Sequence, residues 1–228
     1  MLTELLYKVG RIIIGGYARL MLKMDVHWHD VPPQGPVLYA ANHPSTIDPI
    51  FIHLISEQPV SVMIHSKIFS IPVLGAYMRK MGQIEVIRGK GQSDKVLQQA
   101  VRILASGRSV VIFPEGVISP VDGFAPAHSG VARLALQSGV PVVPIGIHLR
   151  DENCRRVPTT LEGEPEVITW YLNGPYAITV GKPLHYQGDA DDRSLVKTIA
   201  ENVMEHIRNL SHESRQRVGM PRAQSSGS

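Results

Sequence analysis

Short apolar runs alternate with amphipathic segments along most of this 228-residue chain. The apolar runs have the length and composition of buried strands, and the segments between them carry apolar residues at helical spacing. The pattern predicts strands over 25–30, 36–41, 60–65, 83–88, 109–114, 140–147, 166–172 and 176–180. It predicts helices over 46–56, 72–81, 92–106, 129–139 and 190–210. Alternation of this kind is typical of an α/β fold, with a mostly parallel central sheet flanked by helices.

The first 24 residues predict one further helix, which is strongly amphipathic. On a helical wheel its charged residues fall within an arc of about 120°; they are Glu4, Lys8, Arg11, Arg19 and Lys23. Apolar residues occupy the opposite side, at Leu6, Val9, Ile13, Tyr17, Leu20 and Met24. Such a helix either packs permanently on its own domain or lies in a membrane interface, with its cations against anionic headgroups. We adopt the second interpretation, an N-terminal membrane-associating helix.

The predicted organisation has three parts. Residues 1–24 form the amphipathic helix, residues 25–212 form the α/β domain, and residues 213–228 form a disordered tail because they end in a stretch of low apolar content. The hydrophobic fraction of 43% is ordinary for a globular protein. We find no stretch of roughly 18 uncharged apolar residues that would span a bilayer, and we expect no secretory signal.

The charge balance and the cysteine content narrow the classes of partner. A formal charge of +3 is mildly basic, and the cations are too scattered for a nucleic-acid surface. A mildly basic chain is equally compatible with an anionic membrane surface and with a small anionic substrate as its partner. Cys154 is the single cysteine, which excludes an intramolecular disulfide and a cysteine-rich zinc site and indicates a reducing compartment.

The segment "NHPSTIDP", residues 42–49, places candidate chemistry directly after a predicted strand. It holds His43 and Asp48, with Ser45 and Thr46 between them as good helix N-caps. A carboxylate beside an imidazole fixes its tautomer and raises its basicity, so that the other ring nitrogen can take a proton from a hydroxyl. Taken alone, the segment is also compatible with a helix start beside a solvated histidine.

Two more polar turns follow predicted strands. In "FPEG", residues 113–116, Glu115 emerges at a strand end and Gly116 lets the backbone approach a ligand. In "RGKG", residues 88–91, cations lie next to glycines, an arrangement that can hold a phosphate, although the spacing is not that of a nucleotide P-loop. Each turn could also be an ordinary solvated connection.

Other catalytic and metal-binding patterns fail. The chain has neither the G-x-S-x-G turn of many serine hydrolases nor the H-E-x-x-H pattern of zinc proteases. "HWH", residues 27–29, would place two imidazoles on one face of a strand, but the sequence identifies no matching third ligand. We therefore interpret this pattern as structural and expect no metal site.

Taken in order, the motifs resemble those of the glycerolipid acyltransferase family, whose best-known bacterial members acylate lysophosphatidic acid. The resemblance runs from about residue 25 to residue 185, and four motifs in the right order are specific where each alone is weak. It implies an α/β acyltransferase domain over residues 25–212. It also implies that His43 is the general base and Asp48 its orienting partner.

The resemblance assigns further residues to substrate binding. Arg88 would bind the acceptor's phosphate, and the acceptor-binding third motif corresponds to Phe113, Pro114, Glu115 and Gly116. Lys67 matches a lysine often found upstream of the second motif and would stabilise developing negative charge. Pro144 lies in the fourth, hydrophobic motif, which is associated with the acyl donor.

The implied function is O-acyl transfer in phospholipid synthesis. The donor would be acyl-CoA or acyl-carrier protein, and the acceptor a lysophospholipid, first of all 1-acylglycerol-3-phosphate. The resemblance implies no metal or bound cofactor and no nucleic-acid partner. The enzyme would work at the membrane surface, on its cytoplasmic face, as a peripheral or monotopic protein. The alternatives are an acyltransferase for a different polar lipid, an acyl thioesterase or hydrolase, and a membrane-bound binding protein with an inactive site. The intact His43, Asp48 and Glu115 argue against the last of these.

The sequence departs from the family pattern at two places that concern the acceptor. The third motif usually continues Thr-Arg-Ser, but here it continues Val-Ile-Ser, so that Ile118 replaces the arginine. A later stretch that is lysine-rich in many members reads "GFAPAHSG" in this chain. Two cations that could contact an anionic acceptor are therefore missing. Their absence weakens the assignment of lysophosphatidic acid as the acceptor more than it weakens the assignment of acyl transfer as the reaction.

Overall fold

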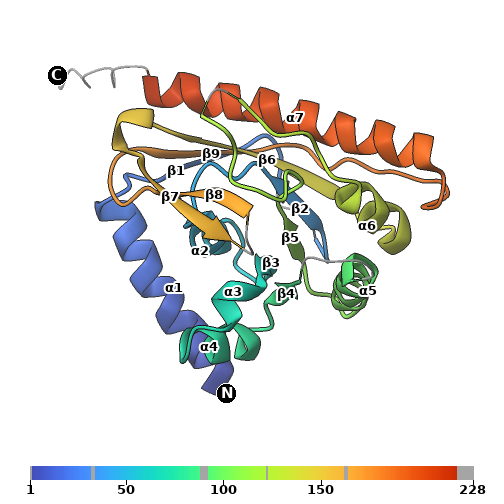
Figure 1. Ribbon diagram of the computed structural model, residues 1–228, viewed down its shortest axis with the longest axis horizontal. Coiled ribbons are helices and arrows are strands. Elements are labelled where there is room, and N and C mark those ends of the chain that lie inside the picture. Colours follow the sequence, from blue (N-terminus) through green and yellow to red (C-terminus); the bar gives the residue numbers. More distant parts are fainter. Residues whose placement is uncertain (1, 32–33, 88–91, 122, 162–163, 220–228) are drawn as a thin grey trace.

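The computed structural model describes residues 2–31, 34–87, 92–121, 123–161 and 164–219 (Figure 1). A seven-stranded sheet forms its centre, in the order β1-β9-β6-β2-β5-β3-β4. These strands are β1 (Asp25–Trp28), β2 (Leu38–Ala41), β3 (Ser61–His65), β4 (Ile84–Val86), β5 (Val110–Ile112), β6 (Val142–Leu149) and β9 (Tyr176–Val180). Neighbouring strands are parallel except β6 and β9, which run antiparallel. The predicted α/β fold with a mostly parallel sheet is confirmed.

The inner strands are mostly apolar because both faces of the sheet are covered. Every residue of β2, β5 and β9 is buried. Strands of this kind read in the sequence as continuous apolar runs, without the alternation of a half-exposed sheet. This is why the apolar runs located the strands so directly.

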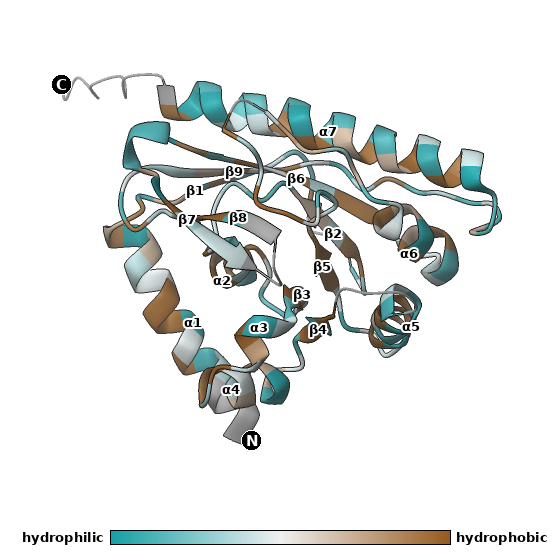
Figure 2. Ribbon diagram, in the orientation of Figure 1, coloured by the Kyte–Doolittle hydropathy of each residue, from teal (hydrophilic) through white to brown (hydrophobic). Residues whose placement is uncertain are grey.

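Helices cover the two faces of the sheet and create two separate cores. One face, which we call the α7 face, carries α5 (Gln92–Ala105), α6 (Gly130–Ser138) and α7 (Arg193–Gly219). The opposite face, the α1 face, carries α1 (Leu2–Leu20), α2 (Asp48–Phe51), η1 (Ile52–Ile55), α3 (Ser66–Phe69) and α4 (Leu74–Lys80). In Figure 2, brown and teal alternate along α7, as expected for a helix with one side on the core.

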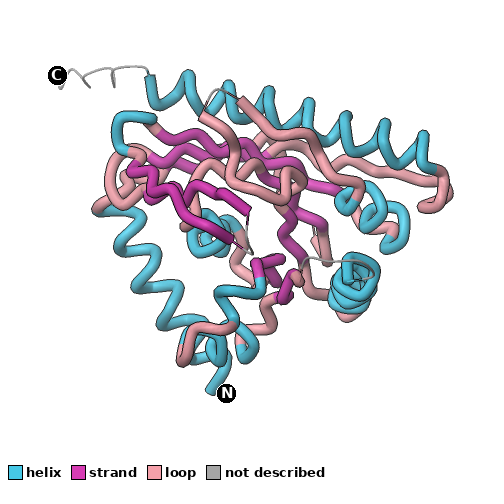
Figure 3. Tube along the Cα trace, in the orientation of Figure 1, coloured by secondary structure: helices cyan, strands magenta, loops and turns pink. Residues whose placement is uncertain are grey.

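A two-stranded antiparallel hairpin stands apart from the central sheet, as the tube in Figure 3 shows. It consists of β7 (Arg155–Leu161) and β8 (Glu164–Trp170), and a short 3₁₀ turn, η2 (Asp151–Asn153), precedes it. The pattern predicted the second strand but missed β7, whose residues include Pro158 and form no apolar run. The hairpin therefore had no clear signal in the sequence.

The predicted boundary of the disordered tail at residue 213 is wrong. Helix α7 continues to Gly219, and residues 220–228 lie outside the described residues. The extra turns are held by tertiary contacts, since Glu213 bonds to His29 and Arg217 to Asp25 at the sheet edge. Low apolar content in the last residues could not reveal those partners.

Helix α1 packs on the domain and also leaves apolar residues exposed. Its inner side includes the buried Ala18 and the partly buried Tyr17, whose ring stacks on Phe51 with centroids 5.9 Å apart. Its outer side exposes Val9, Ile12, Ile13 and Leu20, at 45%, 74%, 67% and 77%. Within the described part of the chain, no helix is both long enough and apolar enough to cross a membrane.

One predicted headgroup contact of α1 is wrong. The Arg11 guanidinium points inward and donates to the backbone carbonyls of His53, Leu54 and Ser56. These carbonyls belong to η1 and the residue that follows it, where a short helix leaves acceptors without partners. Arg11 therefore caps η1, whereas Lys8 and Arg19 remain on the exposed side of α1.

Candidate active site

The candidate site lies at the carboxyl edge of three neighbouring parallel strands. β2 leads to His43, β5 leads to Phe113, and β3 leads to Lys67. The three strands are adjacent in the order β2-β5-β3. Because the carboxyl ends of parallel strands share one edge, segments far apart in the sequence emerge there together.

His43 and Asp48 form the centre of the site, as the spacing suggested. His43 Nδ1 lies 3.0 Å from Asp48 Oδ2, and the Asp48 side chain is fully buried while that of His43 is 16% exposed. Asp48 Oδ2 also accepts the Ser45 N–H at 2.8 Å, and Oδ1 accepts the Tyr176 hydroxyl at 2.6 Å. A buried carboxylate with donors on both oxygens is held in one orientation. Since Nδ1 faces Asp48, Nε2 is the ring nitrogen that can receive a proton.

Tyr176 is a site residue that the sequence analysis missed. It begins β9, 128 residues after Asp48, and is fully buried. Burial raises the pKa of Tyr176 well above its ordinary value, and the neighbouring Asp48 carboxylate raises it further. The hydroxyl therefore stays protonated and donates to Asp48. In the sequence, Tyr176 was one aromatic residue of an apolar strand and had no separate signal.

The third motif packs directly against His43. The Phe113 ring stacks on the imidazole, with centroids 4.2 Å apart and an interplanar angle of 19°. Glu115 is 1% exposed, and its Oε1 accepts the His43 N–H at 3.3 Å and the Ser119 hydroxyl at 2.5 Å. Its Oε2 accepts the Ala125 N–H at 2.6 Å. Burial raises the pKa of Glu115, and these hydrogen bonds oppose the rise. Glu115 thus braces the backbone behind His43, with both oxygens engaged by the chain itself.

The loop after β5 folds back onto the site through contacts of Pro114, Gly116 and Ser119. The Pro114 carbonyl accepts the His128 N–H at 2.8 Å. Gly116 has φ +65°, and a Cβ there would lie 2.9 Å from the His128 ring, so the turn requires glycine. Ser119 binds both backbone groups of His43, its N–H donating to the carbonyl at 2.8 Å and its hydroxyl accepting the N–H at 3.0 Å.

The expected N-cap role of Ser45 and Thr46 is wrong. The N-cap of α2 is Ile47, with no side-chain cap hydrogen bond. The Ser45 hydroxyl donates to the Thr169 carbonyl at 2.8 Å, and the Thr46 hydroxyl accepts the Thr169 N–H at 3.1 Å. These bonds fasten strand β8 of the hairpin to the His43 segment.

Asn42 anchors the same segment on its other side and was also missed. Its side-chain amide donates to the Ile147 carbonyl at 2.9 Å, and its oxygen accepts the Ile147 N–H at 2.7 Å. The buried Asn42 therefore ties the end of β2 to β6. An asparagine beside the more conspicuous His43 gave no hint of a partner 105 residues away.

Three predicted residues, Lys67, Pro144 and Arg88, have no described contact with His43. Lys67 is exposed, and its Nζ donates to the Thr160 carbonyl of β7 at 3.3 Å; no described contact joins it to His43. Pro144 lies within β6 in register with Ala40, whose side chain belongs to the core of the α7 face. Arg88 falls outside the described residues.

The arrangement favours a base without a protein nucleophile. The hydroxyls of Ser45 and Ser119 donate to Thr169 and Glu115, and neither is recorded on the His43 ring. A histidine held by a buried carboxylate can accept a proton from a hydroxyl or a water molecule. The described residues of the site thus support direct attack by a bound hydroxyl group.

Comparison with known proteins finds acyltransferases among the similar sequences. The chain is 26% identical over 148 residues to the lyso-ornithine lipid O-acyltransferase of Pseudomonas aeruginosa, covering 65% of this chain and 57% of that protein. It is 36% identical over 115 residues to a 1-acyl-sn-glycerol-3-phosphate acyltransferase of Chlamydomonas reinhardtii, covering 50% of this chain and 34% of that protein. The chain therefore spans between about a third and somewhat more than half of the length of these relatives.

A solved structure and a family profile complete the comparison. The crystal structure of the 1-acyl-sn-glycerophosphate acyltransferase PlsC from Thermotoga maritima matches 97% of this chain and 81% of that chain, with a TM-score of 0.65. At 17% sequence identity this is a likeness of fold. The sequence profile of the Acyltransferase family matches residues 23–148, which is more than half of the chain. The chain belongs to the Acyltransferase family.

Proposed function

We propose that this protein transfers a fatty acyl group from a thioester to the hydroxyl of a lysolipid. The donor is acyl-CoA or acyl-carrier protein, and 1-acylglycerol-3-phosphate is the first acceptor to consider. The observation that carries the proposal is the 3.0 Å pairing of His43 Nδ1 with a buried Asp48 that other donors hold in place. The family membership agrees with it.

The reaction needs one proton to move twice. The acceptor hydroxyl gives its proton to His43 Nε2 as its oxygen attacks the thioester carbonyl carbon. The tetrahedral intermediate then breaks the C–S bond, and the imidazolium returns the proton to the leaving sulfur. Asp48 stabilises the imidazolium, and the Phe113 ring limits the orientation of the imidazole. A well-placed general base contributes roughly 10²–10⁴-fold, and positioning of the two substrates supplies much of the rest.

Two substitutions test this mechanism. His43→Ala removes the proton acceptor, and Asp48→Asn removes the charge that stabilises the imidazolium, so each should lower kcat by about two to four decades. Product is measured by mass with a labelled acyl-CoA, and circular dichroism shows that each variant is folded. Wild-type turnover in folded His43→Ala protein would refute the mechanism. Donor cleavage at the same rate without any lysolipid would instead indicate a thioesterase.

Lyso-ornithine lipid is a second candidate acceptor for the same assay. Ile118 stands where the family pattern has an arginine, and one relative is named a lyso-ornithine lipid O-acyltransferase. A zwitterionic lysolipid requires fewer cations than a phosphate monoester does. We therefore propose comparing 1-acylglycerol-3-phosphate with lyso-ornithine lipid at equal concentrations.

Ile118→Arg and Arg88→Ala separate the two acceptors. A charge-assisted hydrogen bond is worth roughly 1.5–3 kcal/mol. Ile118→Arg should therefore raise kcat/KM for the phosphate-bearing acceptor by about tenfold or more and leave the other acceptor unchanged. Arg88→Ala should chiefly raise KM for the phosphate-bearing acceptor. Equal effects on both acceptors would show that neither position reads the headgroup.

We further propose that α1 docks the protein on the cytoplasmic face of the membrane as a peripheral or monotopic anchor. The exposed side of α1 combines four apolar residues, Val9, Ile12, Ile13 and Leu20, with the cations Lys8 and Arg19. An interfacial helix uses this combination, with apolar residues in the acyl boundary and cations at anionic headgroups. A lysolipid acceptor resides in the bilayer, so docking would bring the site to its substrate.

A further inference from the structure

The described residues include one group of three side chains that could hold a metal ion, and it does not involve His43. The group consists of His27, His29 and Glu213, whose ligand atoms all lie within 4.8 Å of one another. His27 lies in β1, the edge strand of the sheet. His29 follows directly after β1 and continues its pairing with β9, because its N–H donates to the Val180 carbonyl at 2.9 Å. Glu213 comes from α7, 184 residues after His29. The fold thus supplies the third ligand that the "HWH" pattern lacked.

The strand geometry turns both imidazoles toward α7. Alternate residues of a strand share one face, so His27 and His29 project together and Trp28 projects the other way. Trp28 packs on the core of the α1 face. The two imidazole rings lie 5.7 Å apart with an interplanar angle of 74°. Glu213 Oε2 lies 2.7 Å from His29 Nε2, which brings the carboxylate of α7 to the histidine pair.

We propose that His27, His29 and Glu213 bind a divalent transition-metal ion, with zinc as the ion to test. Two imidazole nitrogens and one carboxylate oxygen form a donor set that suits zinc. Zinc bonds to these atoms are about 2.0–2.2 Å long, so the three side chains need only small rotations to converge on one ion. The side chains of His29 and Glu213 are 32% and 33% exposed, which leaves room for rotation and for water at the remaining coordination positions.

The charges around the group also suit a cation. Arg217 Nη1 lies 3.6 Å from Glu213 Oε1 and is the nearby positive charge that would oppose a metal ion. Its guanidinium is engaged by Asp25 Oδ2 at 2.9 Å and by the Ile178 carbonyl at 2.7 Å. The two carboxylates outnumber this guanidinium, so the cluster keeps one net negative charge. The same contacts hold the end of α7 and preorganise Glu213.

The site lies away from the proposed chemistry. The imidazoles face α7, whereas His43 stacks on Phe113, which belongs to the core of the opposite face. A bound ion would therefore fasten the last turns of α7 to the edge of the sheet. Because it binds the folded chain and not the unfolded one, it should raise Tm.

The experiment titrates the untagged full-length chain, first stripped of metal with a chelator, with zinc chloride alone. Calorimetry should show one zinc ion per chain. At a hundredfold excess of zinc over its Kd, Tm should rise by about 5–10 °C for a domain of this size. Acyltransferase activity of the stripped protein should equal that of the zinc-loaded protein. Absence of stoichiometric binding, or binding without a rise in Tm, overturns the proposal.

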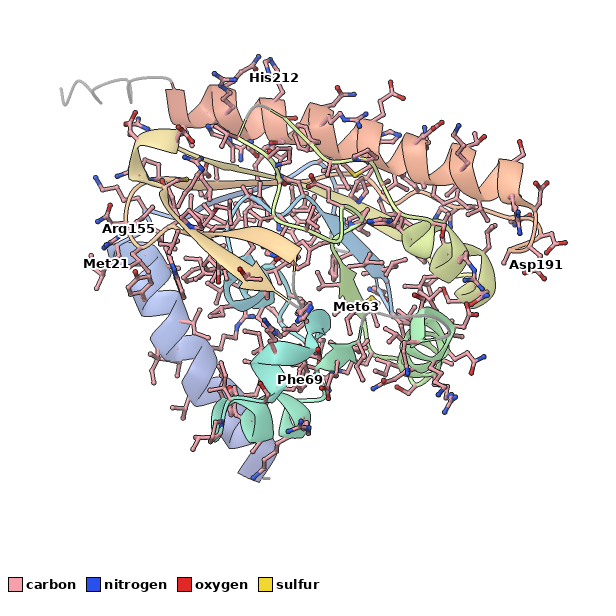
Figure 4. The ribbon with its side chains drawn as sticks, viewed as in Figure 1. Met21, Met63, Phe69, Arg155, Asp191 and His212 are labelled. Carbon is pink, nitrogen blue, oxygen red and sulfur yellow. The ribbon has the colours of Figure 1, made fainter. Side chains whose placement is uncertain are left out.

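Variants identify the ligands. His27→Ala and Glu213→Gln should each weaken zinc binding at least tenfold and abolish the rise in Tm. His212→Ala is the matched control, because His212 projects from the outer side of α7 (Figure 4) and should bind zinc like the wild type. Each variant's Tm in chelator provides its own baseline. Unchanged zinc affinity in Glu213→Gln would mean adventitious binding by surface histidines. A loss of stability in chelator without any zinc effect would mean an ion pair only.

Discussion

Asp48 is held by hydrogen bonds both from its own segment and from a distant strand. One oxygen faces His43 and the Ser45 N–H from its own segment, and the other accepts the hydroxyl of Tyr176 from β9. A buried carboxylate that lost one of these donors would gain freedom to rotate and would carry an uncompensated lone pair. Orientation of His43, the proposed general base, therefore depends through Asp48 on Tyr176, a residue of a distant strand.

Tyr176→Phe should lower kcat about tenfold and leave KM for the acceptor nearly unchanged. One hydrogen bond to a charged group is worth roughly 1.5–3 kcal/mol, and about 1.4 kcal/mol in the barrier corresponds to a factor of ten. Steady-state kinetics across pH provide the measurement. Tyr171→Phe is the matched control, because this buried hydroxyl donates to the Pro175 carbonyl at 2.7 Å and does not bind Asp48. A similar loss of kcat in both variants would show a general packing effect.

At the scale of elements, α1 has two sides with different surroundings. Its inner side packs on η1 and α2 and places Arg11 on carbonyls of η1 and of the following Ser56, while its outer side keeps apolar residues in contact with solvent. Met21, at the end of this helix (Figure 4), is also exposed. Substitutions on the two sides should therefore affect different properties of the protein.

Replacing Ile12 and Ile13 with aspartate should abolish flotation with anionic vesicles and leave Tm unchanged, because both side chains are exposed. Lys8→Gln and Arg19→Gln should weaken binding at low salt, by about 1 kcal/mol each. Val31→Asp, at another exposed apolar position, is the control. Vesicle binding that survives deletion of residues 1–24 would exclude α1 as the anchor.

Arg11→Gln should behave in the opposite way to Lys8→Gln. It removes a charged donor from the carbonyls of His53, Leu54 and Ser56, so the free energy of unfolding should fall by about 1.5–3 kcal/mol. Vesicle binding of the folded variant should be unchanged. The comparison of chemical denaturation with flotation separates the two roles. A vesicle-binding defect equal to that of Lys8→Gln would contradict the inward placement of Arg11.

At the scale of the whole molecule, the close approach of α7 to β6 holds the two layers together. The hydroxyls of Ser211 and Ser214 donate to the carbonyls of Ile147 and Gly146, each at 2.9 Å. Gly146 permits this approach, since a Cβ there would lie 2.0 Å from the Ser211 nitrogen. A helix in such contact with a strand cannot accommodate even one methyl group without moving.

Gly146→Ala should therefore destabilise the protein by about 3 kcal/mol or more, the upper range for overpacking. Gly16→Ala is the matched comparison. It lies in α1 with nothing within 4 Å of the added Cβ, and alanine in a helix is favoured over glycine by about 0.5–1 kcal/mol. Thermal unfolding should show a lower Tm for the first variant and a slightly higher one for the second. Equal shifts would mean that α7 can move away from β6 at little cost.

The amino-acid sequence by itself determined the α/β class, most strand positions and the pairing of His43 with Asp48. Each of these depends on local chemistry: a continuous apolar run, a period of apolar residues, or two side chains five positions apart. Burial on both faces makes a strand visible in the sequence, because nearly every position is apolar. Proximity along one segment likewise brings His43 and Asp48 within reach of each other, although distant residues hold the pair in its orientation.

Only the tertiary structure decided which distant groups complete these local features. Tyr176 reaches Asp48, Asn42 reaches Ile147, and Glu213 reaches His29 across 128, 105 and 184 residues. The periodicity of α1 likewise identified its charged and apolar residues, but packing decided that Arg11 points inward and Ile12 outward. The physical reason is that periodicity records whether a position is buried, whereas its partner depends on strand order and register across the whole sheet.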